Sequence, residues 1–330
     1  MKIMKKEMKT IDLFAGVGGI RLGFEKIGFK TVYANDFNKL CKETYDLNHG
    51  EPKLHIEDIN KVEIKELPKF DILLGGFPCQ PFSIAGHRKG FKDEKDRGNL
   101  FFRIVDILKE RKPEAFLLEN VKNLKGHDKG RTFKIIKQNL EELGYSIKSK
   151  VLNSMIHGNM PQNRERIFIA GFLDKQKAEA FDFPSETKLT KSFRDFVKEE
   201  VEDKYYYNNK PLYEKIKQDV NSEQTVYQWR RKYVRSNKKC VVPTLTANMG
   251  RGGHNVPLIK NSKGIRKLTP KECFMLQGFP DSFKLPPNLS DSELYHQAGN
   301  SVTVSVIQRV AENMKKVLDG ERINSQLSLN

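Results

Sequence analysis

The N-terminal half of the chain alternates short apolar runs with glycine turns and stretches of helical periodicity. Residues 10–14 and 29–34 form two such runs, and residues 20–27 between them carry apolar side chains at helical spacing. A strand that is buried on both faces is largely apolar, and most residues of these two runs are apolar. The order of strand, glycine turn, helix and strand predicts an α/β fold around a parallel sheet.

The same alternation continues to about residue 174 and then stops. Charged residues, asparagine and tyrosine dominate from there to about residue 220, without the periodicity of an α/β unit. We therefore predict an α/β domain that extends to about residue 174, followed by a second region of different composition. The other predicted elements are strands at 55–59, 70–74, 113–118, 149–153 and 166–172 and helices at 39–45, 99–108, 268–277 and 301–310.

The composition of the chain indicates a polyanionic partner. The net charge of +17 arises from 59 basic and 42 acidic residues, and such an excess favours nucleic acid. No apolar run is long enough to span a membrane, and the basic N-terminus lacks the apolar stretch of a signal peptide. The four cysteines lie far apart and form no Cys-x-x-Cys pair, which is typical of a reducing compartment. We expect a cytoplasmic protein without disulfides.

One cysteine is a candidate nucleophile. Cys79 lies between Pro78 and Gln80, shortly after the apolar run at 70–74 and a pair of glycines. In an open α/β sheet, chemistry takes place beyond the carboxyl ends of the strands, and the prolines restrict the backbone there. Cysteine is also among the residue types most often buried, so a purely structural thiol is the alternative.

Charged side chains are expected at the same edge of the sheet. Glu119 directly follows the predicted strand at 113–118, which makes its carboxylate a candidate acid or base. Arg164 and Arg166 stand at alternating positions, so in a strand they would share one face. Such a pair of arginines suits a phosphate or a carboxylate.

The glycine turn at 15–19 indicates a nucleotide-type ligand. Glycines let the backbone approach a ligand at a helix N-terminus, although the pattern here is shorter than that of NAD sites. Asp36 follows about 20 positions later, where a carboxylate can bind ribose hydroxyls. Phe37 could lie against an adenine ring. Asp36 could instead cap the helix that follows it.

Six short motifs follow one another along the chain, at residues 12–19, 76–80, 119–121, 162–166, 268–280 and 299–302. In residues and in order they resemble the motifs of the cytosine-C5 DNA methyltransferases, over nearly the whole chain. The resemblance implies an α/β fold with a Rossmann-like, S-adenosylmethionine-dependent catalytic and cofactor-binding domain at 1–180 plus 296–330. It also implies a smaller, irregular, mostly β target-recognition domain with its hinge at 181–295. The overall length and motif spacing resemble those of a bacterial enzyme without regulatory extensions. The resemblance therefore implies the modification half of a restriction-modification system.

The resemblance also implies a role for each reactive residue. Cys79 would attack C6 of cytosine as a thiolate, and Glu119 would hold N3 and the exocyclic amine. Arg166 would lie beside the base, supported by Arg164. The cofactor would be S-adenosyl-L-methionine, with S-adenosyl-L-homocysteine as the product and no metal. The residues lining this cofactor would be Phe14, Gly16, Gly18, Asp36, Phe37, Asp58, Ile59, Pro78, Leu100, Asn300 and Ser301.

The implied substrate is double-stranded DNA with the target cytosine flipped out, because C6 is inaccessible inside a duplex. Residues 228–235 concentrate basic and aromatic side chains, and residues 248–255 form a glycine-rich polar loop, which suits nucleic-acid contact. We expect a monomer with no membrane contact and no stable complex with a cognate restriction endonuclease. The residues expected to contact DNA are Gln80, Ser83, Arg88, Arg97, Trp229, Arg230, Arg231, Thr246, Asn248 and Arg251.

Four other functions compete with this one. A zinc nucleobase deaminase needs a second cysteine three positions after Cys79, and this position is Phe82. A nicotinamide dehydrogenase would leave Cys79 and the basic region unexplained. A non-catalytic DNA-binding protein would need neither Cys79 nor Glu119. An RNA (tRNA) cytosine-C5 methyltransferase would reuse the same catalytic residues, but the sizeable recognition region favours duplex DNA.

Overall fold

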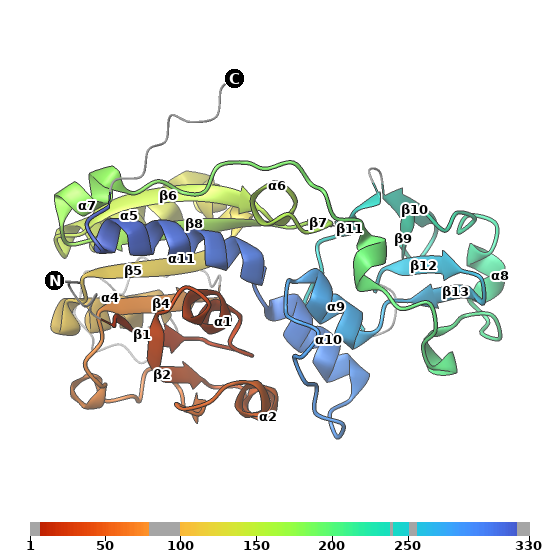
Figure 1. Ribbon diagram of the computed structural model, residues 1–330, viewed down its shortest axis with the longest axis horizontal. Coiled ribbons are helices and arrows are strands. Elements are labelled where there is room, and N and C mark those ends of the chain that lie inside the picture. Colours follow the sequence, from red (N-terminus) through yellow and green to blue (C-terminus); the bar gives the residue numbers. More distant parts are fainter. Residues whose placement is uncertain (1–6, 79–99, 238–239, 251–255, 322–330) are drawn as a thin grey trace, which may run out of the picture. The chain divides into compact units, whose positions relative to one another are not determined.

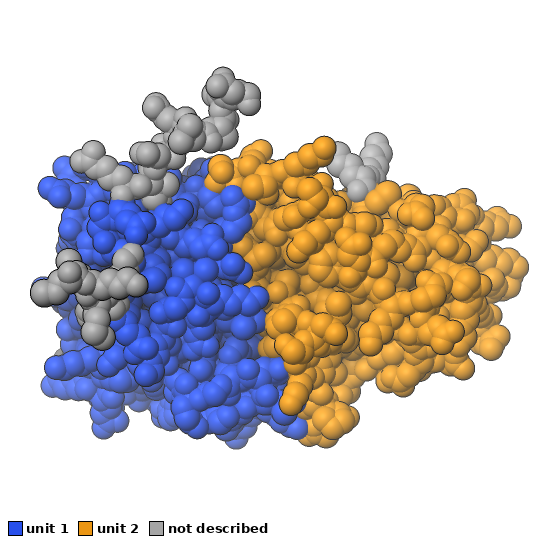
Figure 2. All heavy atoms as spheres, in the orientation of Figure 1, with its two compact units in different colours: residues 1–152, 165–184, 307–330 blue, residues 153–164, 185–306 orange. Residues whose placement is uncertain are grey.

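The computed structural model describes residues 7–78, 100–237, 240–250 and 256–321. Its contacts divide the chain into two units, which Figure 2 colours separately. The first unit contains residues 1–152, 165–184 and 307–330, and the second contains residues 153–164 and 185–306.

A seven-stranded sheet forms the first unit, and its strands can be followed in Figure 1. The strand order is β3-β2-β1-β4-β5-β8-β6, with parallel pairs from β3 to β5 and an antiparallel pair between β5 and β8. The predicted Rossmann-like α/β fold is therefore confirmed. Its strands are β1 (Lys9–Leu13), β2 (Lys30–Asp36), β3 (His55–Ile56), β4 (Ile72–Gly76), β5 (Ala115–Val121), β6 (Ser146–Asn153) and β8 (Glu165–Phe172). Its helices are α1 (Gly19–Glu25), α2 (Lys39–Asn48), α4 (Leu100–Arg111), α5 (Arg131–Glu142) and α7 (Lys175–Ala180).

The central strands of this sheet are apolar because helices and loops cover them. Ile11 of β1, Leu73 of β4 and Phe116 of β5 are fully buried in one cluster with Ile104 of α4. Burying each such side chain stabilises the fold by roughly 1.5–3 kcal/mol. Since β1, β2, β4 and β5 are parallel, their carboxyl ends lie at one edge of the sheet. The residues that follow these strands are therefore neighbours in space.

The second unit is smaller and contains an antiparallel sheet, as predicted. It holds a four-stranded antiparallel sheet of order β10-β9-β12-β13 and a two-stranded sheet of β11 and β7. Its strands are β7 (Gln162–Asn163), β9 (Val226–Trp229), β10 (Val234–Asn237), β11 (Val242–Pro243), β12 (Leu258–Asn261) and β13 (Gly264–Lys267). Its helices are α6 (Ser154–Gly158), α8 (Tyr213–Ile216), α9 (Pro270–Leu276) and α10 (Asp291–Asn300), and α11 (Val304–Leu318) continues from it into the first unit.

The two units differ in extent from the predicted domains. Residues 153–164 and 296–306 cluster with the second unit, because their buried polar side chains bond within it. Gln162 donates from Nε2 to the carbonyl oxygen of Leu276 at 3.0 Å. The hydroxyls of Ser154 and Thr303 lie 2.6 Å apart. That the units act as a catalytic and a target-recognition domain stays a prediction.

Several helices differ from the sequence-based prediction. α5 and α10 were not predicted, and the helix expected at 301–310 begins at Val304 and continues to Leu318. The break before Val304 arises because α10 ends at Asn300 and Ser301 adopts an extended conformation. Among the described residues, no helix combines the length and apolarity needed to cross a membrane.

Candidate functional site

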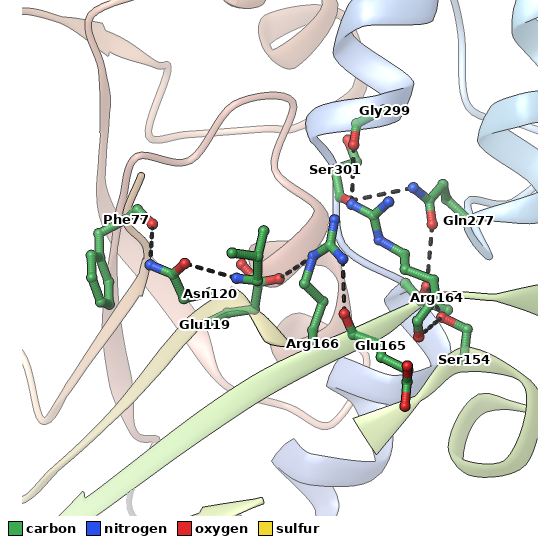
Figure 3. A network of polar contacts seen from close by, with 12 residues as sticks. Phe77, Glu119, Asn120, Ser154, Arg164, Glu165, Arg166, Gln277, Gly299 and Ser301 are labelled. Atoms are coloured by element: carbon green, nitrogen blue, oxygen red, sulfur yellow. Dashed lines mark hydrogen bonds and ion pairs between the residues drawn. The ribbon is translucent and has the colours of Figure 1, made fainter. Parts of the chain in front are cut away.

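Glu119 and Arg166 form an ion pair near the end of β5, which Figure 3 shows. Glu119 lies opposite Phe168 and Val121 lies opposite Arg166, so the two charged side chains are diagonal neighbours on one face of the sheet. Nε of Arg166 is 3.0 Å from Oε1 of Glu119, and the side chains are only 18% and 11% exposed. Such a charge-assisted pair restricts the orientation of the carboxylate.

Glycine at the end of β4 borders the same carboxylate. Gly76 pairs with Glu119 in the parallel register of β4 and β5. A Cβ atom at position 76 would lie 3.5 Å from Oε2 of Glu119. This distance is an ordinary van der Waals contact, so the end of β4 lies directly beside the carboxylate.

Asn120 anchors the backbone that leads toward Cys79. Its Nδ2 donates to the carbonyl oxygen of Phe77 at 2.9 Å, and its Oδ1 accepts from the N–H of Val121 at 2.8 Å (Figure 3). Asn120 is 2% exposed, and Phe77 is buried as well. Asn120 has no role of its own in the sequence-based prediction, although a polar residue near the end of a buried strand is a usable signal. Cys79 itself lies outside the described residues.

The turn between β1 and α1 contains three residues in the left-handed region. Phe14, Gly16 and Gly18 have φ values of 56°, 55° and 81°. A Cβ atom at Gly18 would lie 2.2 Å from Nε2 of His49, so only glycine fits there. His49 supports the turn by donating from Nε2 to the carbonyl oxygen of Val17 at 3.1 Å. Burial lowers the pKa of His49 to about 4, so the imidazole is neutral at neutral pH.

Asp36 joins the end of β2 to this turn. Its Oδ2 accepts from the N–H of Gly16 and its Oδ1 from the N–H of Asn38, both at 2.8 Å. The side chain of Asn38, not of Asp36, caps α2 by accepting from the N–H of Leu40, so the capping alternative for Asp36 is wrong. Burial raises the pKa of Asp36. Beside it, the ring of Phe37 is 71% exposed.

These residues fit the nucleoside part of the expected cofactor. A carboxylate offers about four acceptor sites, so Asp36 retains capacity for ribose hydroxyls. An exposed ring such as Phe37 suits a stacked adenine. At Gly16, a Cβ atom would meet no other atom within 4 Å, so the backbone there borders open space. That Gly16, Asp36 and Phe37 bind the cofactor stays a prediction.

The remaining predicted cofactor residues differ in their exposure and in the unit to which they belong. Pro78 and Asp58 are exposed, Leu100 is half-buried, and Ile59 is 3% exposed within the core cluster of the first unit. Asn300 and Ser301 belong to the second unit, where Oγ of Ser301 donates to the carbonyl oxygen of Gln297. Their contact with a cofactor stays a prediction.

A buried carboxylate lies behind the glycine turn. Asp12 is fully buried, and burial raises its pKa to about 7. Its Oδ2 accepts from the N–H of Arg21 at 3.2 Å. The guanidinium of Arg21 pairs with Glu25 at 2.8 Å and donates to the hydroxyl of Tyr45 and the carbonyl oxygen of Pro52. This network was not predicted, because its only signal in the sequence is a charged residue among apolar helix positions.

Arg164 and Arg166 do not share one face of a strand. β7 ends one residue before Arg164, and β8 begins one residue after it. Arg164 is 2% exposed and binds backbone carbonyls, whereas Arg166 pairs with a carboxylate. That Arg164 supports catalysis stays a prediction. Its guanidinium donates to the carbonyl oxygens of Leu245, Gly299 and Ser301 at 2.6, 3.0 and 2.6 Å.

A cavity of about 930 Å³ lies within the second unit. It brings together four residues that the sequence predicted to contact DNA, namely Arg230, Arg231, Thr246 and Asn248. Trp229 is not among the lining residues, because its ring packs partly against the hydrophobic cluster of this unit. A DNA contact by Trp229 stays a prediction.

Some predicted site residues fall outside the described part of the chain. Within the described residues, no group of three or more His, Cys, Asp or Glu side chains is arranged to hold a metal ion. The predicted residues outside the description are Cys79, Gln80, Ser83, Arg88, Arg97 and Arg251.

Comparison with known proteins shows a matching family and several relatives of similar sequence. A family model described as C-5 cytosine-specific DNA methylase matches residues 8–316. The type II methyltransferase M.Bsp6I of Bacillus sp. (strain RFL6) is 52% identical over 314 residues, which are 94% of this chain and 99% of that protein. The type II methyltransferase M.DsaV of Dactylococcopsis salina is 42% identical over 96% of this chain and 88% of its own length.

Solved structures share the fold at lower identity. The S. pombe Dnmt2 methyltransferase superposes with a TM-score of 0.73 at 21% identity, covering 94% of this chain and 99% of the other. The two proteins therefore have the same fold.

Proposed function

This chain belongs to the C-5 cytosine-specific DNA methylase family, and from that premise we propose how its residues act on DNA. It is a DNA (cytosine-5)-methyltransferase of the type II restriction-modification kind. The proposal assigns the nucleophile to Cys79 and the proton-sharing acid to Glu119. The observation that carries it is the Glu119–Arg166 pair, whose glutamate lies opposite Gly76, three residues before Cys79 in the sequence.

The ring carbon C5 of cytosine is a poor nucleophile. The sulfur of Cys79 adds to C6, and the electron pair displaced from the C5–C6 bond makes C5 an enamine carbon. Glu119 shares a proton with N3 and so stabilises the negative charge that develops there. Arg166 holds the carboxylate of Glu119 in place. After C5 has gained the methyl group, loss of its proton breaks the bond between sulfur and C6 and restores the ring.

S-adenosyl-L-methionine would supply that methyl group when bound. The backbone N–H groups of the turn at Gly16, the carboxylate of Asp36 and the ring of Phe37 would hold its nucleoside part. The partly buried hydrogen bond from the N–H of Gly16 to Asp36 would hold the turn and the carboxylate together.

The proposed substrate is double-stranded DNA, from which the target cytosine is flipped out at a cost of a few kcal/mol. The arginines and amides lining the cavity of the second unit support DNA contact. We propose that the enzyme acts as a monomer without a stable endonuclease complex.

The experiment is capture of the covalent adduct. Fluorine at C5 cannot leave as a proton does, so the Cys79–C6 bond should persist on 5-fluorocytosine DNA in the presence of S-adenosyl-L-methionine. We expect a DNA-linked band on a denaturing gel for the wild type and for Cys240→Ser, which removes an exposed thiol. Cys79→Ser should give none. An equal adduct with Cys79→Ser would falsify the assignment, and methylation of transfer RNA in place of duplex DNA would contradict the substrate.

A further inference from the structure

The hairpin of β9 and β10 has two chemically different faces. Trp229 and Val234 are opposite each other and pack partly against the hydrophobic cluster of the second unit. Gln228 and Arg235 are the next opposite pair, and both line the cavity. Successive side chains of a strand point to opposite faces, so one face of the hairpin stabilises the unit and the other lines the cavity.

Gln228 and Arg235 can act on one ligand group. Directly opposite residues of an antiparallel pair have Cβ atoms about 4.5–5.5 Å apart. Gln228 is only 7% exposed, and its side-chain amide has no hydrogen bond to any part of the chain that the structure describes. Arg235 is exposed and likewise has no ion pair among the described residues. Neither polar side-chain atom of Gln228 is among the fully buried atoms that lack a hydrogen bond, so the amide borders the cavity, where a ligand can bind it.

The neighbouring amide in the same hairpin behaves differently. Asn237 donates from Nδ2 to the carbonyl oxygen of Val226 at 3.1 Å, so it closes the hairpin. Gln228 has no such structural bond among the described residues and is available to a ligand in the cavity.

We propose that Arg235, with Gln228 beside it, reads a guanine of the recognised DNA sequence outside the methylated base pair. This inference rests on the proposed function. A guanidinium donates to O6 and N7 of guanine at once, and an amide beside it can bind the adjoining base edge. The major groove is about 12 Å wide and admits a two-stranded β-ribbon. β10 is the edge strand of its sheet, so no further strand of the described residues covers this side of the hairpin.

A phosphate contact is the competing explanation for an exposed arginine. Phosphate needs charge only, and a lysine can supply it, whereas reading a guanine needs the planar fork of arginine. A phosphate would also leave the amide nitrogen and oxygen of Gln228 only half used, because a phosphate oxygen only accepts hydrogen bonds. The paired arrangement therefore favours a base edge.

The experiment measures which cytosines in a random DNA library become methylated, by bisulfite sequencing. The wild type should show a guanine at a fixed distance from the methylated cytosine. Arg235→Lys keeps the charge and should reduce the preference for guanine at that one position by roughly five- to 150-fold, since a bidentate contact contributes about 1–3 kcal/mol of discrimination. The preferences at the other positions should remain.

Lys232→Gln is the matched control, because Lys232 lies in the turn of the same hairpin and does not line the cavity. It should weaken methylation of all sequences equally. An unchanged sequence profile in Arg235→Lys, or an equal loss at every position, would overturn the inference. If the wild type methylates no cytosine in DNA at all, the proposed function fails instead. Arg235→Gln, with an unchanged fluorescence spectrum of Trp229 as evidence of folding, provides the second variant and should show the same loss at one position.

Discussion

Asn120 and Asp12 are polar side chains that the fold buries next to the expected reactive groups. Both are 2% exposed or less. Each bonds to a backbone atom far along the chain or on a neighbouring element, so neither role is visible in local sequence. Substitution of Asn120 tests whether the backbone before Cys79 needs this anchor. Substitution of Asp12 tests the energetic cost of burying a carboxylate.

Asn120→Asp should slow methylation without a comparable loss of DNA affinity. The aspartate keeps an acceptor for the N–H of Val121 but cannot donate to the carbonyl oxygen of Phe77. The backbone before Cys79 then loses its anchor, and we expect a single-turnover rate about 10- to 100-fold lower, since small misplacements of reacting groups are costly. Rapid-quench kinetics and DNA titration would measure both quantities. A wild-type rate for the folded variant would contradict this positioning role.

Asp12→Asn should change how stability depends on pH. The pKa of this carboxyl rises from 3.8 to about 7 on folding, so the folded state binds more protons than the unfolded state between these values. The free energy of unfolding therefore falls as pH rises from about 4 to 7. Asparagine removes this penalty, which is on the order of 4 kcal/mol at about 1.4 kcal/mol per pKa unit. Urea unfolding at pH 5 and pH 8 should show a larger advantage of Asp12→Asn at pH 8, and a pH-independent difference would refute the assignment.

At the scale of elements, α9 depends on a buried ion pair. Arg266 and Glu272 are 0% and 2% exposed in their side chains, with Nη2 and Oε1 2.8 Å apart. Glu272 also accepts from the N–H of Thr269 at 2.7 Å, and the hydroxyl of Thr269 accepts from the N–H of Glu272. The start of α9 is therefore joined to β13 by charge as well as by a capping box.

Glu272→Ala should destabilise the second unit by about 3–5 kcal/mol, because it leaves a buried arginine without its partner. Glu214→Ala is the control, since Glu214 is 69% exposed in an ion pair with Lys217 and should cost no more than about 1 kcal/mol. The fluorescence of Trp229, the single tryptophan, reports on this unit during urea unfolding. Equal midpoints for the two variants would show that the buried pair contributes little.

At the scale of the whole molecule, charge dominates the interaction with DNA. The net charge of +17 predicts that DNA binding releases several counterions. We expect affinity for duplex DNA to fall by a factor of about 10³ or more between 50 and 200 mM salt. Binding of S-adenosyl-L-methionine to the same protein should change little over this range. Fluorescence anisotropy with labelled DNA would measure the slope, and a flat response would exclude a substrate bound mainly through phosphates.

The order of strands and helices in the first unit could be predicted because a strand covered on both faces has an apolar sequence. The antiparallel direction of β8 could not, since periodicity does not depend on strand direction. α10 escaped prediction because its residues mix polar and apolar types, and only contacts within the second unit bury its Leu294 and Tyr295.

The sequence by itself determined the α/β fold, the glycine turn before α1, and the places of Asp36 and Glu119 at strand ends, since these follow from local patterns. The tertiary structure decided the partner of each charged side chain. Arg164 binds a carbonyl 81 residues away, whereas Arg166, two positions along, pairs with Glu119. It also decided that Gln228 and Arg235 line one cavity wall while Trp229 packs into the core. Such contacts depend on which distant segments the fold brings together, and local sequence patterns do not specify these segments.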